Sequence, residues 1–411
     1  MRDIPNRLIG GPNRLIGGPK RLIGGLVLVA VTAMGVGPVR AARLDAPTSA
    51  TPAAALRVGL NALLSEHVYL AAAATGAALG GRQPEFEAAA VALDANSVDV
   101  ATAIGSVYGP EAEQAFLPLW RKHIGMVVDY TVGVATKDRA RQDRAVSDLV
   151  GYTQDFGAFL SGANPNLPKP VVADLVKHHV LTLKAVIDAQ AAQEPDRVFS
   201  ALRTGAGHMQ MIGDPLAGAI VTQFPGRIAG ISESPAAGLR ATLNLALREH
   251  VYLASAATGA ALGGRDAEFK AAAGALDANS VVISKAIGSV YGADAEKAFL
   301  PLWRRHIGMV VDYTVGKATN DRAKQDRAVN ELIGYTQDFG AFLSGANPNL
   351  PKSVVADLVK HHVVTLKDVI DAQAAKDHPR AFMAERTGAG HMQMIADPLA
   401  EAIVQQFPDR F

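Results

Sequence analysis

Histidines are the residues of this sequence whose type and spacing could do chemistry. In the first half of the chain, His67, His123 and His179 each take a place on the apolar stripe of an expected helix, near the middle of its length. His208 lies beside the stripe of a further helix, and all four recur in the second half. The eight candidate metal ligands are His67, His123, His179, His208, His250, His306, His362 and His391. Because neighbouring helices of an antiparallel bundle meet at equal depth, we expect these rings to share a central layer.

Several buried imidazoles need hydrogen-bond partners, water or a metal, since an unsatisfied buried polar group costs about 1–3 kcal/mol. Glu66, Asp94 and Asp129 are candidates to hold the second ring nitrogens. Met209 and Met211 flank His208, and thioether with imidazole suits copper, or the axial ligation of haem iron. Copper is therefore the first expected cofactor and haem the second. The alternative is a buried hydrogen-bonded layer of histidines without metal.

Other kinds of chemistry find little support in the sequence. Cysteine is absent, which excludes thiolate metal sites and cysteine nucleophiles. There is no His-Glu-x-x-His motif, no Glu-x-x-His pair of the di-iron type and no Gly-x-Ser-x-Gly motif. The net charge is +1 with no basic stripe, so we expect no nucleic-acid partner.

An internal duplication determines the expected fold. Residues 56–224 align without a gap to the segment that starts at residue 239, with about 132 of 169 positions identical. Each copy divides, at Gly and Pro signals, into about six helical segments joined by short turns. One break is expected at Gly213-Asp214-Pro215, with Asp214 as a cap. The sequence predicts an all-α protein of two tandem homologous helical-bundle domains, with repeat 1 at 56–224, a linker at 225–238 and repeat 2 at 239–411.

The N-terminal segment has the order of a secretory signal. Basic residues precede an uncharged apolar stretch at 22–39, and small residues follow in a cleavage-like pattern. We expect a signal peptide at 1–41, a flexible leader at 42–55, and a secreted, periplasmic or cell-envelope location. A membrane would be a partner only if the apolar segment were retained as an anchor.

Some strings of the sequence are similar to a known group of proteins. They are Glu66-His67, the run from Ala92 to Asn96, the run from His123 to Thr131, and His208-Met209-Gln210-Met211 followed by Asp214. The chain resembles uncharacterised secreted bacterial helical-repeat proteins, some of which are named after an attached domain like the N-terminal domain of copper amine oxidases. The resemblance covers both repeats and implies export and a helical domain. It does not imply amine oxidase activity.

The sequence thus predicts an exported metal-binding helical-bundle protein with one buried, histidine-lined site per repeat. A non-catalytic interaction or structural module of the cell envelope is the alternative class, and a metal-dependent oxidoreductase is a third. A metal ion is the one partner that these residues indicate.

Overall fold

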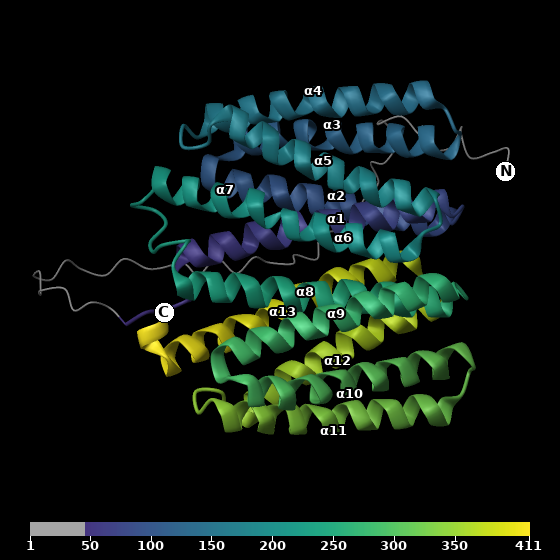
Figure 1. Cartoon of the computed structure of the whole chain (residues 1–411), viewed down its shortest axis with the longest axis vertical. Coiled ribbons are helices and arrows are strands. Elements are labelled where there is room, and N and C mark those ends of the chain that lie inside the picture. Colours follow the sequence, from purple (N-terminus) through teal and green to yellow (C-terminus); the bar gives the residue numbers. More distant parts are fainter. Residues whose placement is uncertain (1–45) are drawn as a thin grey trace, which may run out of the picture. The chain divides into compact units, whose positions relative to one another are not determined.

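Helices make up nearly all of the part of the chain that the computed structural model describes, residues 46–411. No strand occurs in this range, which confirms the predicted all-α fold (Figure 1). Both repeats belong to one compact unit, Pro47–Phe411. The expected signal peptide at 1–41 lies outside the described residues.

Each repeat is a bundle of six helical segments in the same order. The first contains α1 (Pro52–Leu79), α2 (Gln83–Tyr108), α3 (Pro110–Ala135), α4 (Arg139–Ala163), α5 (Lys169–Ala191), and a sixth segment divided into α6 (Pro195–His208) and α7 (Gln210–Gln223). The second contains α8 (Pro235–Leu262), α9 (Asp266–Tyr291), α10 (Ala293–Ala318), α11 (Arg322–Ala346), α12 (Lys352–Ala374) and α13 (His378–Gln406), followed by a 3-10 turn, Pro408–Arg410.

The first helix of each repeat lies at the centre of its bundle. α1 contacts α2, α3, α5, α6 and α7, and α8 makes the corresponding contacts in the second repeat. Alanines and leucines cover most of its circumference, so it is buried on nearly all sides. Its length and composition would also suit a membrane span, but most of this stretch is enclosed by the other helices. A polar side chain on α1 therefore points into the interior of the bundle.

Both repeats begin earlier than the sequence suggested. α1 starts at Pro52, inside the expected flexible leader, and the Thr51 side chain accepts a hydrogen bond from the backbone N–H of Ala54. α8 starts at Pro235, inside the expected linker, with Ser234 as the equivalent cap. A hydroxyl cap followed by proline at the first helical position is a helix start signal, which the flexible composition of these segments concealed.

The expected break at Gly213-Asp214-Pro215 is wrong. α7 runs through Pro215, and the only interruption of the sixth segment in repeat 1 is at Met209, about one turn earlier. Asp214 is not a cap, because its carboxylate accepts hydrogen bonds from Arg57 at 2.7 Å and 2.5 Å and from Asn61 at 2.7 Å. These bonds attach α7 to α1 and compensate for the backbone hydrogen bond that Pro215 cannot donate.

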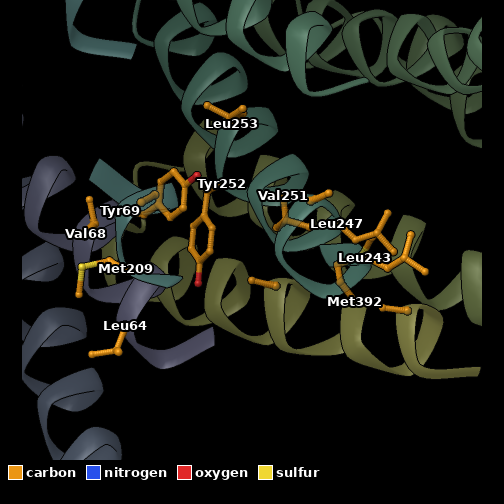
Figure 2. Close-up of a cluster of buried hydrophobic side chains, with 14 of the residues drawn as sticks. Leu64, Val68, Tyr69, Met209, Leu243, Leu247, Val251, Tyr252, Leu253 and Met392 are labelled. Atoms are coloured by element: carbon orange, nitrogen blue, oxygen red, sulfur yellow. The ribbon is translucent and has the colours of Figure 1, made fainter. Parts of the chain in front are cut away.

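The two repeats pack against each other in a reciprocal way. α1 contacts α8, while α6 of the first repeat contacts α9 and α13 of the second contacts α2. At the centre, the rings of Tyr69 and Tyr252 stack with centroids 4.5 Å apart, surrounded by apolar side chains of both repeats (Figure 2).

Ion pairs cross between the repeats on both sides of this stack. Arg203 donates to Glu249 at 2.8 Å, and the equivalent Arg386 donates to Glu66 at 3.0 Å. The hydroxyl of Tyr252 also donates to Glu66, at 3.0 Å. Each repeat thus supplies the arginine that neutralises the buried or half-buried glutamate of the other.

Candidate metal centre

Three helices bring one histidine each to the middle of the first bundle. His67 comes from the central helix α1, His123 from α3 and His179 from α5. Each takes the place of an apolar residue on an inward stripe, so helical periodicity alone directs the rings to the core. All three are buried, with exposed fractions of 1%, 3% and 5%. We call this group the first triad.

The ring nitrogens of the first triad converge on one point. One nitrogen from each ring lies within 4.8 Å of the other two. The Nε2 atoms of His67 and His123 are 3.3 Å apart. A tetrahedral ion with metal–nitrogen bonds of about 2.1 Å separates two ligand nitrogens by about 3.4 Å. The separation of His67 and His123 therefore fits two ligands of one ion, and His179 lies close enough to be the third.

The second repeat reproduces this geometry. His250, His306 and His362 form a second triad with nitrogens again within 4.8 Å, and the Nε2 atoms of His250 and His306 are 3.3 Å apart. The chain therefore contains two buried three-histidine groups, one per repeat, that could hold a metal ion.

Burial keeps these imidazoles uncharged at neutral pH. It lowers the pKa of His67 well below its usual range, that of His123 to about 3 and that of His179 to about 4, with neighbouring histidines adding to each shift. The second triad behaves alike, because burial lowers the pKa of His306 to about 3 and that of His362 to about 4. Neutral imidazole is the form that binds a metal ion.

Aromatic rings enclose the first triad. Trp120 meets the rings of His67 and His123 edge-on at 5.0 Å and 4.7 Å, and Tyr152 of α4 lies 5.3 Å from His123. The indole N–H of Trp120, the hydroxyl of Tyr152 and the Nδ1 atoms of the triad lack hydrogen-bond partners. Sequence reasoning did not assign Tyr152 to this layer, although it lies on the apolar stripe of its helix. A group of orphaned polar atoms at one level of a core indicates that a ligand or water completes it.

A small cavity adjoins the first triad. It has a volume of about 40 Å³ and is lined by His123, His179, Trp120, Tyr152 and Met209, with apolar side chains around them. A cavity needs about 10–15 Å³ of such space to hold one water molecule, so this one has room for a water molecule or an ion. The buried methionine of the sequence His-Met-Gln-Met thus lines the cavity, whereas Met211 is exposed.

The structure does not bring the fourth expected ligand into either group. The ring of His208 stacks on the exposed His178 at a centroid distance of 4.2 Å. Its Nε2 lies 3.0 Å from the carbonyl oxygen of Leu175, and so must carry the proton that it donates. His391 repeats the hydrogen bond with the carbonyl of Leu358, and its ring centroid lies 4.0 Å from that of His361 at a tilt of 55°. His208 and His391 lie beside the apolar stripes of their helices rather than on them, so their rings face α5 and α12 instead of the centre of the bundle.

The carboxylates expected to hold the second ring nitrogens have other partners. Glu66 accepts from Asn96 at 2.8 Å and from Arg386. Asp94 pairs with Arg121, and Asp129 pairs with Arg141. Neither triad includes a carboxylate among the residues that the structure describes. Both groups are therefore neutral, apolar-walled sets of three nitrogens.

Fold and site together define an all-α tandem-repeat protein with a buried three-histidine group in each repeat. Comparison of the chain with protein-family models, curated proteins and solved structures finds no match.

Proposed function

We propose that the chain is an exported metal-binding protein that holds one copper(I) ion at each histidine triad. The observation that carries the proposal is the convergence of three uncharged ring nitrogens, within 4.8 Å of one another, in the core of each repeat. Imidazole nitrogens suit copper, zinc, iron and nickel, so the ligand type alone leaves the metal open.

The charge of the site favours a monovalent ion. No carboxylate belongs to either triad in the described part of the chain, so the ion's charge would be buried without a counter-charge. The Born cost of burying an ion rises with the square of its charge, so a divalent ion costs about four times as much as a monovalent one. The thioether of Met209 at the same cavity is a soft donor, which also favours copper(I).

The size of the site disfavours haem, the second cofactor expected from the sequence. Three rings already fill the centre of the bundle, and the adjoining cavity of about 40 Å³ has room for an atom or a water molecule rather than a porphyrin. Export is supported by the order of basic, apolar and small residues at the N-terminus.

Copper(I) titration against a coloured chelator tests the proposal, with metal-free protein, a reductant and no affinity tag. We expect two ions per chain. His123→Leu should leave one, because the second repeat keeps its triad, and adding His306→Leu should leave none. His208→Gln is the matched control and should still bind two. A chain that binds no copper(I), or variants that keep two sites, would refute the proposal.

One observation favours a second candidate function, a structural module without metal. A neutral His67 can donate from Nε2 to Nε2 of His123 across the 3.3 Å that separates them, or the reverse. In that case two histidines of each triad satisfy each other's Nε2 atoms without a metal ion. The same titration distinguishes the two, since a purely structural layer would take no copper(I) from the chelator. Thermal unfolding gives a second measurement, because copper(I) would then leave the melting temperature unchanged.

A further inference from the structure

A second site lies where the two repeats meet, and nothing in the metal proposal uses it. A cavity of about 760 Å³ is lined by residues of α1, α2 and α6 from the first repeat and of α8, α9 and α13 from the second. This volume is within the range of about 300–1,000 Å³ that is typical of small-molecule sites.

The walls of this interface cavity are mainly apolar. Phe199 and Leu202 of α6 face the cavity from one repeat, and Phe382 of α13 from the other. Small residues such as Gly76 and Gly259 keep the central helices from filling it. Such walls bind the hydrocarbon part of a ligand by removing it from water.

One acidic side chain is buried in the wall of the cavity. Glu385 is 8% exposed, and none of the ion pairs among residues 46–411 includes it. Burial raises its pKa to about 8, with the Ser255 hydroxyl opposing the shift and the negative Glu66 adding to it. A buried carboxyl group without a positive partner therefore stays largely protonated at neutral pH, and a cationic ligand in the cavity would stabilise its ionised form.

The basic residues around the cavity do not supply that charge. Arg82 pairs with Glu85 and Arg265 with Glu268, each at 2.8 Å, while Lys376 is exposed. The buried hydroxyl of Tyr252 is already bound to Glu66. Glu385 is thus the buried acid of this cavity that lacks a counter-charge within the described chain.

The pair of Glu385 and Ser255 is contributed by the second repeat only. At an offset of 183 residues, the first repeat has Leu202 in place of Glu385 and Ala72 in place of Ser255. All four residues line the cavity. Two repeats that are otherwise nearly identical thus differ where they face this space, so that the buried acid lies on the side of the second repeat only.

We propose that the interface cavity binds a small amphiphile with an apolar body and a protonated amine, whose ammonium group is received by Glu385 beside Ser255. The hydrocarbon part lies between Phe199, Phe382 and the neighbouring leucines. When the ammonium group binds, the carboxyl group of Glu385 releases its proton to solvent, and the ammonium group supplies the positive charge and the hydrogen bonds that the resulting carboxylate needs.

Calorimetric titration of the full chain with three ligands of equal chain length tests the proposal. The probes are decylamine, 1-decanol and decanoate at neutral pH, added to metal-free protein so that the result does not depend on the triads. We expect decylamine to bind at least about tenfold more tightly than decanol, which corresponds to about 1.4 kcal/mol, and decanoate to bind most weakly. Equal affinities, preference for decanol, or no binding would overturn the proposal.

Variants distinguish the contribution of Glu385 to binding from that of the apolar cavity walls. Glu385→Leu, which copies the residue of repeat 1, should abolish the preference for decylamine and leave decanol binding unchanged or tighter. Glu385→Gln should do the same and covers the case in which the leucine variant does not fold. Ala256→Trp, at a position on the cavity wall, should prevent binding of all three probes. The matched control Glu268→Gln removes an acid at the rim and should keep the preference. Retention of the preference in both Glu385 variants would refute the assignment.

Discussion

The chemistry of the triads depends on what surrounds each imidazole. His67 meets Trp120 and two other neutral rings, and no charged group lies in the triad. Removing water from these rings disfavours their protonated forms more than any neighbour favours them. The same burial that leaves the nitrogens free for a metal ion makes the stability of the protein depend on pH.

The metal-free protein should lose stability as the pH falls. The triad histidines have a pKa near 6.5 when unfolded, and in the folded chain burial lowers the pKa to about 3 for His123 and about 4 for His179. The unfolded state therefore binds more protons below pH 6.5, and each buried histidine removes about 1.4 kcal/mol per pH unit between about pH 6.5 and about pH 4. Denaturant unfolding at a series of pH values measures this loss.

A double variant provides the comparison for this prediction. His179→Leu with His362→Leu removes one titrating ring per repeat and should reduce the slope of stability against pH by up to about 2.7 kcal/mol per unit. An unchanged slope in the variant would mean that these rings are not the source of the acid sensitivity.

At the scale of the element, most helix boundaries follow from local signals. Gly80-Gly81 and Gly109 end α1 and α2 as expected, and Asn164 ends α4. The break predicted at Pro215 was wrong. The local sequence shows that proline removes a backbone hydrogen bond, but it does not show the hydrogen bond from Arg57 to Asp214 that holds the helix in place. Helix existence was therefore predictable, whereas continuity was decided by tertiary contacts.

The candidate site was also predictable only in part from the sequence. Periodicity identified His67, His123 and His179, because an apolar stripe fixes which residues face the core. It could not place His208, whose ring is captured by the carbonyl of Leu175, nor the partner of Glu66, which comes from the other repeat. Glu385 was missed, although the difference between repeats at positions 202 and 385 was a signal for it.

The close packing of α4 on α5 leads to a second prediction, which concerns the stability of two glycine variants. A Cβ added to Gly157 would meet the carbonyl oxygen of Lys169 at 2.8 Å, whereas one added to Gly151 of the same helix meets nothing within 4 Å. Gly157→Ala should therefore destabilise the protein by about 1–3 kcal/mol, as overpacking does. Gly151→Ala should stabilise it by about 0.5–1 kcal/mol, because alanine is the better helix former. Chemical denaturation of both variants is the measurement, and equal effects would contradict the close contact.

At the scale of the whole described unit, the two repeats depend on each other. The carboxylate of Glu66 is 4% exposed and receives its positive charge from Arg386 of the other repeat. Glu249 and Arg203 make the reciprocal pair, with side chains 17% and 24% exposed. Ion pairs this well shielded from water are coupled more strongly than those on the surface.

A double-mutant cycle across the interface tests this coupling. Glu66→Gln and Arg386→Met should show an interaction energy of about 1–3 kcal/mol in denaturant unfolding. The exposed pair Asp94 and Arg121, with side chains 53% and 46% exposed, is the control. Asp94→Asn and Arg121→Met should couple by less than about 1 kcal/mol. Similar values for the two cycles would show that the contact between repeats contributes no more than a surface pair.

Only the second repeat contributes a buried acid, Glu385, to the interface cavity, and this determines how a bound ligand is oriented there. Two separate copies of one chain, related by a twofold axis, would present every side chain twice, and an elongated guest would then have two equivalent poses. Because both repeats belong to one chain, the second can carry Glu385 and Ser255 while the first carries Leu202 and Ala72. A polar-headed guest therefore has a single orientation, with its head toward α13 and its tail toward α6.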